Sequence, residues 1–342
     1  MRNRRIINTF TICLLTISVI TGCGSKEYIG ASDGNSTPSA TISNSANSDN
    51  SNTTPASTSE TSPAEASSNE KGTRDNTPVC LIPEAPGTVV YENEYVTIDA
   101  TNASQGYICA EYKGTCPKVK MQITCPSSTI YTYLLGDGQE TFPLTTDSGA
   151  YSISVFENTI DTQYSTVFRT DFEVNIEDSF GPYLYPNQYV KFTPESNCVA
   201  KGAELAYSAN SDLDVVTNVY NYVIGNIKYD TEFANVVESG YTPTPDNTLA
   251  SGKGICLDYS ALMASMLRSQ TIPTHMEVGF AGSAYHAWIS VYLDEIGWVN
   301  GIIEFDGTSW NLMDPTMAAN SNEAELKKFI GDGSNYETKY IY

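Results

Sequence analysis

The chain has 342 residues, 40% hydrophobic and 17% charged, which is enough for one large domain or two of ordinary size. Its 18 basic and 40 acidic side chains give a formal net charge of −22 without any cluster of Lys and Arg, so no nucleic-acid partner is expected. The only histidines are His275 and His286, which excludes a three-histidine zinc site. We therefore expect neither a metal nor another cofactor.

The first 22 residues have the features of a secretory signal. Three arginines within the first five residues precede an apolar run over residues 6–20, which is shorter than the roughly 20 residues of a membrane span. The run ends in Ile20-Thr21-Gly22-Cys23, which resembles the bacterial lipobox. This resemblance implies cleavage before Cys23, lipidation of that residue, and anchoring at the extracytoplasmic face of the cell membrane. The alternative is an ordinary signal peptide in which Cys23 has no special role.

Residues 23–78 are predicted to form a disordered tether. Ser, Thr and Asn make up 24 of the 40 residues from 31 to 70, and this stretch has no aromatic residue, Lys or Arg. Such a sequence cannot bury enough apolar area to offset the entropy lost on ordering. We expect the tether to hold the folded part of the chain away from the membrane.

Residues 79–188 are predicted to form an all-β, immunoglobulin-like sandwich. Six short segments are rich in Val, Ile, Thr and Tyr, and several of them alternate in polarity as strands do. The predicted strands cover residues 88–91, 95–100, 119–124, 129–135, 149–156 and 167–176. Glycine-containing turns follow at residues 136–138 and 147–149, a pattern typical of antiparallel sandwiches. We interpret this domain as a spacer or positioning domain, with ligand binding as the alternative.

The pattern becomes helical beyond residues 180–186, where we expect a domain boundary. Ser211 followed by Asp214 three residues later predicts an N-terminal capping box. Apolar residues then recur at helical spacing and are expected to face the core. They are Val216, Val219, Tyr220, Val223 and Ile227. The second domain is expected to span residues 189–342.

The most informative stretch is Gly-Lys-Gly-Ile-Cys-Leu-Asp-Tyr-Ser at residues 252–260. Two glycines are expected to make a flexible segment before Cys256, and a helical apolar run begins directly after it. That run consists of Tyr259, Leu262, Met263, Met266 and Leu267. Cys256 is therefore placed in the first turn of a buried helix, where unpaired N–H groups and the helix dipole favour the thiolate. The same N–H groups could hold an oxyanion.

Two further segments supply partners for this thiol. Residues 285–293 alternate as a strand does, with His286 at the start of one face. Asp314 lies at the end of a predicted strand that follows an Asp-Gly hairpin signal. On an adjacent antiparallel strand Asp314 would accept a hydrogen bond from the His286 imidazole and fix its tautomer. Residues 294–309 between them are interpreted as one extended hairpin that could overhang the cleft.

Other polar residues fit catalysis less well. His275 lies on the polar face of a predicted strand and is expected to be structural or exposed. A group of carboxylates could suggest a glycosidase pair, but on so acidic a chain a solvated face is the simpler interpretation. These residues are Asp294, Glu295, Glu304 and Asp306.

Residues from about 198 to 320 resemble the transglutaminase-like superfamily, in its papain-related branch. The matching segments are Ile227-Lys228-Tyr229-Asp230, Gly252-Lys253-Gly254-Ile255-Cys256-Leu257-Asp258-Tyr259, Gly279-Phe280-Ala281, His286-Ala287-Trp288 and Trp310-Asn311-Leu312-Met313-Asp314-Pro315-Thr316. The resemblance implies an α+β fold, with Cys256 as nucleophile, His286 as general base and acid, and Asp314 as the residue that orients it. The implied activity is thiol acyl transfer or amide hydrolysis through a thioester, on a protein or cell-wall peptide substrate.

Two questions stay open at this level. The chain is either such an enzyme or a non-enzymatic envelope-binding or adhesive protein that uses the same fold as a scaffold. The predicted cleavage before Cys23 removes Cys13, so five cysteines of the mature chain remain after Cys23 and Cys256 are assigned, and at least one of them is unpaired. They are Cys80, Cys109, Cys116, Cys125 and Cys198. Cys109 and Cys116 flank a turn and could form a disulfide in an oxidising exterior.

Overall fold

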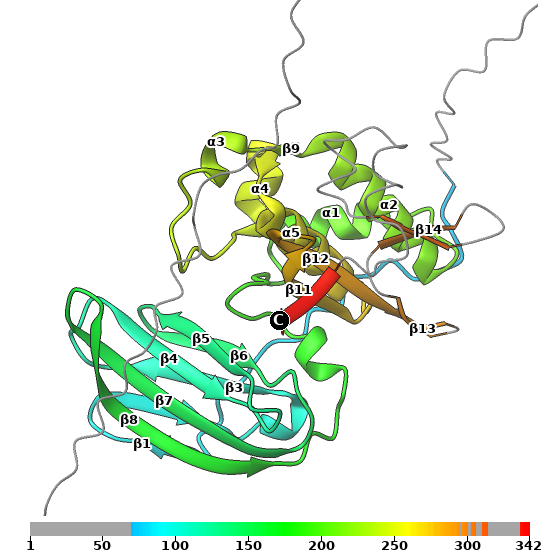
Figure 1. The fold of residues 1–342 in the computed structure, drawn as a ribbon. Helices are drawn as coiled ribbons and strands as arrows, with labels where there is room; N and C mark the ends of the chain where they lie inside the picture. Colours follow the sequence, from blue (N-terminus) through cyan, green and yellow to red (C-terminus); the bar gives the residue numbers. More distant parts are fainter. Residues whose placement is uncertain (1–69, 295, 300–301, 306–309, 314–335) are drawn as a thin grey trace, which may run out of the picture. The chain divides into compact units, whose positions relative to one another are not determined.

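The computed structural model describes residues 70–294, 296–299, 302–305, 310–313 and 336–342 (Figure 1). The predicted signal, the candidate lipidation residue Cys23 and the candidate catalytic residue Asp314 lie outside these ranges. Within them, no helix combines the length and the apolar character that crossing a membrane requires.

Residues 90–174, called the β module below, fold into two antiparallel four-stranded sheets (Figure 1). The first has the order β1-β2-β3-β6, made of β1 (Val90–Glu92), β2 (Val96–Asp99), β3 (Tyr107–Tyr112) and β6 (Gln139–Pro143). The second has the order β5-β4-β7-β8, made of β5 (Ile130–Leu135), β4 (Val119–Thr124), β7 (Gly149–Ile160) and β8 (Gln163–Val174). Ile98 and Ile108 of the first sheet and Met121 and Ile153 of the second belong to one hydrophobic cluster.

All six predicted strands are present in this region, and β4 has the predicted bounds. Strands β3 and β6 were not predicted. The first four residues of β3 are all buried, so this strand lacks the alternation that identifies a strand with one exposed face. The β7–β8 hairpin is longer than predicted, with 12 residues in each strand. It turns at Asp161, which has a φ of 50°.

The six cysteines within the described ranges are free thiols, so the disulfide considered between Cys109 and Cys116 is not formed. Cys109 lies in β3, where its Sγ is 3.8 Å from the Thr141 hydroxyl of the neighbouring strand β6. Cys116 lies beyond the turn, and its thiol donates to the Lys118 carbonyl at 3.4 Å. The two cysteines are close in sequence, but the Cys109 thiol in β3 and the Cys116 thiol in the loop after it each contact a different partner.

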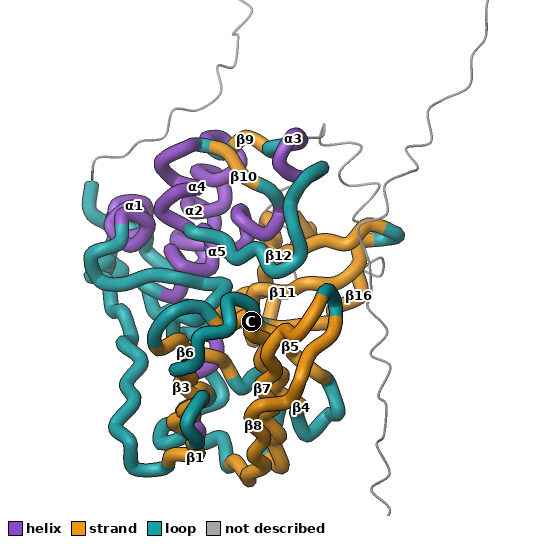
Figure 2. Tube along the Cα trace, turned by 90° about the vertical axis from the view of Figure 1, so that its left-hand side faces the viewer, coloured by secondary structure: helices purple, strands orange, loops and turns teal. Residues whose placement is uncertain are grey.

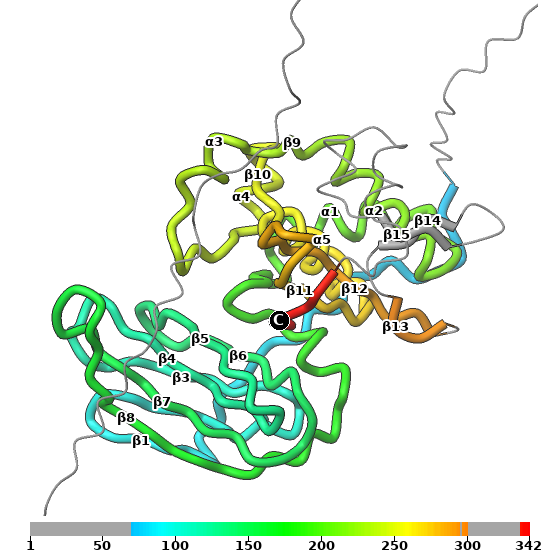
Figure 3. The backbone as a smooth tube through the Cα atoms, viewed as in Figure 1, coloured from blue at the N-terminus to red at the C-terminus, as the bar shows by residue number. Residues whose placement is uncertain are grey.

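The rest of the chain combines helices with a third four-stranded antiparallel sheet. The helices are α1 (Asn197–Leu205), α2 (Asp212–Asn226), α3 (Thr231–Ala234), α4 (Pro245–Ser251) and α5 (Cys256–Arg268). Of these, α1, α2 and α4 all pack against α5 (Figure 2). The sheet has the order β13-β12-β11-β16, made of β13 (Gly297–Val299), β12 (Ala284–Leu293), β11 (Thr274–Ala281) and β16 (Tyr336–Ile341). Strand β16 was not predicted, and it runs beside β11 (Figure 3).

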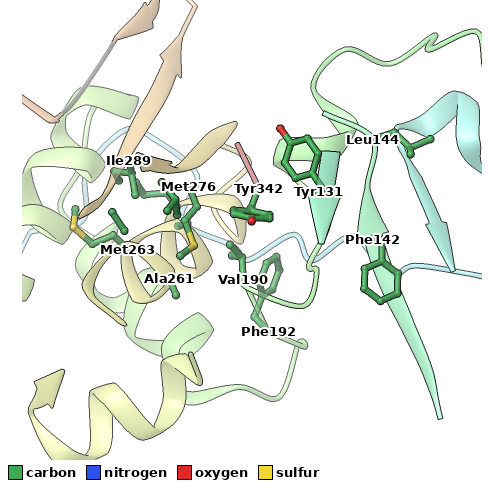
Figure 4. Close-up of a cluster of buried hydrophobic side chains, with 14 of the residues drawn as sticks. Tyr131, Phe142, Leu144, Val190, Phe192, Ala261, Met263, Met276, Ile289 and Tyr342 are labelled. Carbon is green, nitrogen blue, oxygen red and sulfur yellow. The ribbon is translucent and has the colours of Figure 1, made fainter. Parts of the chain in front are cut away.

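Helix α5 packs against β11 and β12, and this contact places the candidate site. Met263 of α5, Met276 of β11 and Ile289 of β12 belong to one hydrophobic cluster (Figure 4). All three side chains are fully buried. A helix buried on this scale is held mainly by its packing rather than by its intrinsic propensity.

The predicted amphipathic helix and its capping box are confirmed in α2. The Ser211 hydroxyl accepts from the Asp214 N–H at 3.2 Å, and the Asp214 carboxylate accepts from the Ser211 N–H at 3.1 Å. The predicted apolar stripe is buried along its whole length. Two orphan N–H groups of the first turn are thereby satisfied.

The expected pairing between the strands of His286 and Asp314 is wrong for the described residues. Strand β12 has β11 and β13 as its neighbours, whereas β15 (Trp310–Met313) pairs with β14 (Ile302–Phe305) in a separate two-stranded sheet. The chain turns back directly after β12, where the Ile296 N–H donates to the Leu293 carbonyl at 2.9 Å. Because this turn closes a very short loop, β13 takes the free edge of β12. The intervening segment is therefore not one extended hairpin.

The last part of the predicted tether is ordered. The Gly72 N–H donates to the Tyr207 carbonyl at 2.9 Å. The Arg74 guanidinium donates to the Gln270 carbonyl at 2.6 Å and pairs with Asp212 at 2.5 Å. Residues 70–78 therefore do not belong to a disordered tether as predicted, because this segment finds backbone partners on the helical part of the chain.

Candidate active site

Cys256 is the first residue of α5, as predicted, and its side chain is half-buried. The residue before it, Ile255, has an extended conformation with ψ 178° and forms the N-cap. The predicted apolar run after Cys256 is fully buried at every position. The thiol thus lies at the N-terminus of a buried helix while remaining within reach of solvent, where the helix dipole favours a negative charge.

The segment before Cys256 is fixed rather than flexible. Gly252 ends α4 in the left-handed region, with a φ of 65°. Its carbonyl accepts from the Lys228 N–H at 2.8 Å, and the Gly254 carbonyl accepts from the Asp230 N–H at 2.9 Å. These bonds form the parallel pair of β9 (Lys228–Tyr229) and β10 (Lys253–Gly254). Two of the segments that carry the family resemblance, residues 227–230 and 252–259, therefore meet beside the thiol.

Side chains reinforce this junction. Lys253 pairs with the Asp230 carboxylate at 2.8 Å, and this contact holds the pKa of Asp230 below its usual value and raises that of Lys253. Asp230 also accepts from the Phe233 N–H at 3.0 Å and so caps α3. From the helix side, the Tyr259 hydroxyl donates to the Ile227 carbonyl at 2.6 Å.

His286 lies near the start of β12, opposite Gly279 of β11, and is 9% exposed. Its ring lies 6.3 Å from that of Trp288, at an angle of 26°, as expected for two residues on one face of a strand. Gly279 permits close pairing here, since a Cβ at this position would lie 2.0 Å from the Glu337 carbonyl oxygen of β16. The predicted strand and its predicted face are confirmed.

Tyr285 precedes His286 in β12, and its ring lies 5.6 Å from that of Phe280 on β11. The residue is 57% exposed, yet desolvation of its hydroxyl, followed by the charges of Tyr340, Tyr189 and Cys256, raises its pKa to about 12. The hydroxyl of the residue before His286 therefore stays protonated at neutral pH.

His275 is packed against aromatic side chains, which agrees with the structural role expected as one of two alternatives from the sequence. Its ring stacks on Trp298 with centroids 3.6 Å apart and meets Tyr183 edge-on at 4.0 Å. Burial lowers the pKa of His275, which favours the neutral ring. Among the carboxylates considered, Asp294 is exposed; the side chains of Glu295, Glu304 and Asp306 lie outside what the structure describes.

Two buried carboxylates beside the site were not singled out from the sequence. Asp258, two residues after Cys256, is 1% exposed and accepts from the Ile255 N–H at 2.9 Å. Its position three residues after the N-cap is a capping signal that the sequence contains. Glu277 of β11 is also buried and accepts from the hydroxyls of Ser290 and Thr338. Nothing in the sequence indicates the Thr338 contact, because it depends on the pairing of β16 with β11.

No group of three or more His, Cys, Asp or Glu side chains in the described part of the chain is arranged to hold a metal ion. The candidate site therefore consists of a half-buried thiol at a helix N-terminus and a histidine on the sheet against which that helix packs. This layout defines a mixed α+β domain.

Residues 200–301 match the family model of the transglutaminase-like superfamily, so the chain contains a transglutaminase-like domain. Cys256 and His286 fall within the matched residues, and Asp314 lies beyond them. The UPF0252 protein of Methanocaldococcus jannaschii is 28% identical over 163 residues, which are 43% of this chain and 46% of that protein. The chain thus matches less than half the length of that relative.

Solved structures show distant similarity. A candidate cysteine protease from Cytophaga hutchinsonii is 16% identical with a TM-score of 0.32, covering 67% of this chain and 69% of that one. A candidate protease from Parabacteroides distasonis is 12% identical with a TM-score of 0.27, covering 61% and 63%. Red sea bream transglutaminase is 13% identical with a TM-score of 0.24, covering 63% and 48%.

Proposed function

We propose that this protein is a thiol acyltransferase or amide hydrolase of the papain-like transglutaminase type, acting through Cys256, His286 and Asp314. The observation that carries the proposal is the position of Cys256: it opens a buried helix, remains half-exposed, and that helix packs on the strand of His286. The family match over residues 200–301 supports the same assignment.

The proposed reaction begins when His286 takes the proton of the Cys256 thiol and the thiolate attacks an amide carbonyl carbon. The Cys256 N–H, unpaired in the first helical turn, donates to the oxyanion of the tetrahedral intermediate. The C–N bond then breaks, His286 protonates the departing amine, and a thioester remains. Water or a second amine attacks the thioester and gives its proton to His286; the C–S bond breaks, the acid or new amide leaves, and the Cys256 thiolate takes the proton back from His286. Asp314 accepts a hydrogen bond from the imidazole throughout.

The proposal extends to the location of the enzyme. Cys23 carries the lipid anchor, the chain lies on the extracytoplasmic face of the membrane, and its substrate is a protein or cell-wall peptide. The β module is an immunoglobulin-like domain that positions the catalytic domain. Cys23→Ser should move the protein from the membrane fraction to the soluble fraction; a variant that stays in the membrane fraction contradicts the anchor.

Reactivity of the thiol tests the catalytic proposal. Iodoacetamide labelling at pH 7, followed by mass spectrometry of each cysteine peptide, compares Cys256 with Cys116 in the same sample. Cys116 is the matched control, because it is also half-buried but lies in a loop. We expect Cys256 to react about tenfold faster or more, and His286→Ala to remove this difference. Equal labelling of the two thiols in the native protein would contradict the proposal.

A second assay separates transfer from hydrolysis. The protein is incubated with proteins or cell-wall peptides and a labelled primary amine, with Cys256→Ala as the control. Incorporation of the amine that depends on Cys256 indicates transfer, and new termini or free acids alone indicate hydrolysis. If Cys256 is unreactive and neither product forms, the non-enzymatic binding or adhesive function is favoured.

A further inference from the structure

The carboxylate of Asp258 uses both of its oxygens at the start of α5. Oδ2 accepts from the Ile255 N–H at 2.9 Å, and Oδ1 accepts from the Tyr241 hydroxyl at 2.7 Å. No ion pair of Asp258 occurs within the described part of the chain; the nearby Lys253 pairs with Asp230 instead. A carboxylate that is 1% exposed and lacks a cation depends on such hydrogen bonds to remain charged.

Asp258 is also packed tightly against the segment that leads to Cys256. A Cβ placed on Gly254 would lie 2.6 Å from the Asp258 Cβ, so only glycine leaves room for this side chain. The Ile255 N–H that Asp258 binds belongs to the residue directly before Cys256. Any movement of the Asp258 carboxylate would therefore be transmitted to the turn that holds the thiol.

Tyr241 is itself held in place, although it lies in the loop between α3 and α4. Its ring meets Phe233 edge-on at 5.0 Å, and its N–H donates to the Glu238 carbonyl at 3.2 Å. Gly240 beside it has a φ of 91°, and a Cβ there would lie 2.3 Å from the Leu134 Cδ1 of β5. The loop thus packs closely against the β module at the residue before Tyr241.

We propose that Tyr241 is a positioning residue for Cys256, acting through the Asp258 carboxylate to fix the first turn of α5. The inference rests on the proposed function of Cys256. The Tyr241 hydroxyl donates to the carboxylate, the carboxylate holds the Ile255 N–H, and the thiol that follows keeps its place at the helix N-terminus. The β module contributes by supporting the loop through Leu134.

Charge makes this arrangement sensitive to pH. Burial raises the pKa of Asp258, while the bonds from Tyr241 and Ile255 oppose that rise and the charge of Asp230 adds to it. Removing the Tyr241 hydroxyl should therefore raise the pKa of Asp258 further. The carboxylate would then take up its proton at a higher pH, so the hold on Ile255 would weaken at a higher pH. The other charged or titratable groups on the elements packed around this turn are Lys253 and Asp230, which pair with each other, and Tyr285 and His286 on β12.

The test compares Tyr241→Phe with the unaltered full-length chain. The rate of iodoacetamide labelling of Cys256, relative to Cys116, is measured from pH 5 to pH 9. We expect labelling in the acid half of this range to fall about two- to tenfold, with the acid limb of the profile displaced to higher pH. The matched control is Tyr151→Phe, which also removes a buried hydroxyl bond, from Tyr151 to the Thr146 carbonyl at 2.9 Å in the β module, and should leave the profile unchanged.

A double-mutant cycle decides whether Asp258 transmits the effect. Asp258→Asn keeps an acceptor for Ile255 but cannot titrate, so adding Tyr241→Phe to it should change the labelling profile little. The proposal is overturned if Tyr241→Phe labels like the unaltered protein at every pH. It is equally overturned if the effect of Tyr241→Phe persists in full in the Asp258→Asn background.

Hydrogen exchange of the Ile255 amide distinguishes failure of this inference from failure of the proposed function. Tyr241→Phe should increase that exchange several-fold whether or not Cys256 is a nucleophile. Faster exchange with an unreactive Cys256 would refute the proposed function and retain the contact. Unchanged exchange with a reactive Cys256 would refute the positioning role and retain the function.

Discussion

Among single residues, Arg268 shows how a buried polar side chain can hold separate segments of the chain together. Arg268, the last residue of α5, is 1% exposed and donates to the carbonyls of Thr274, Tyr342 and Tyr185, at 2.8, 2.6 and 2.8 Å. In the sequence it looks like an ordinary basic residue at a helix C-terminus. In the fold it joins three segments, because its guanidinium donates to carbonyls that lie far apart in the sequence.

The buried carboxylate of Glu277 should make the stability of the fold depend on pH. Burial by itself would raise its pKa, but the contacts with His275, Ser290 and Thr338 outweigh it and hold the pKa below its usual value of 4.5. A carboxyl group with a lowered pKa stabilises the fold above its ordinary pKa, and this contribution is lost as the pH falls through the folded value. Glu277→Gln should therefore lower stability at pH 7 and flatten the loss of stability below about pH 4.5.

Urea unfolding at pH 7 and at intervals down to pH 3 measures this difference. His275 acts in the same direction at higher pH, because its pKa is lowered by burial and the unfolded ring takes up a proton first as the pH falls. A variant that loses stability with acid as steeply as the unaltered chain would contradict the role of Glu277.

At the scale of elements, the start of α5 is determined by the glycine before it. Two-residue strands β9 and β10 bring the backbone of Gly254 against Asp258, and nothing larger fits. The segment is thus part of the site's architecture rather than a flexible connection. A helix N-terminus that carries a nucleophile has to be held rigidly if the thiol is to keep its position.

Gly254→Ala should destabilise the protein by about 1–3 kcal/mol, because overpacking forces the backbone or Asp258 to shift. It should also slow the labelling of Cys256. Gly225→Ala is the matched control: Gly225 lies inside α2 with nothing within 4 Å of its added Cβ, and alanine is the better helix former. That variant should be more stable by about 0.5–1 kcal/mol in the same urea experiment. Equal effects of the two substitutions would show that packing at Gly254 is not decisive.

At the scale of the whole molecule, aromatic residues join the β module to the sheet of the transglutaminase-like domain. Tyr131 of β5 accepts from the Ile341 N–H at 3.3 Å, and its ring lies 5.4 Å from Tyr340 and 5.7 Å from Tyr342. Figure 4 shows Tyr131 and Tyr342 side by side next to Met276 of β11. The β module and the helices and sheet that follow it accordingly belong to one compact unit.

Tyr131→Ala should uncouple the unfolding of the β module from that of the helical part of the chain. We expect the β module and the helical part to melt in two transitions in calorimetry, where the unaltered chain melts in one. Ile130→Ala in the same strand is the control, since Ile130 is exposed and should leave a single transition. If Tyr131→Ala lowers the melting temperature but keeps one transition, the coupling does not depend on this residue.

Short sequence patterns were enough to locate much of the candidate active site. The alternation of β12, the capping box of α2 and the apolar run after Cys256 each reflect a period that side-chain burial imposes on consecutive residues. The family resemblance followed from the same short segments, and the match over residues 200–301 bears it out. Such features are encoded within about ten residues and can be recognised without the fold.

Only the tertiary structure decided which strands become neighbours and which polar groups meet. It placed β13 rather than β15 beside β12, added β16 to the edge of β11, and brought Tyr241 to Asp258. Contacts of this kind join residues that are distant in sequence, and they form where loop closure and burial favour them. The sequence by itself located the candidate nucleophile, its helix and the candidate base; the fold determined what holds them in position.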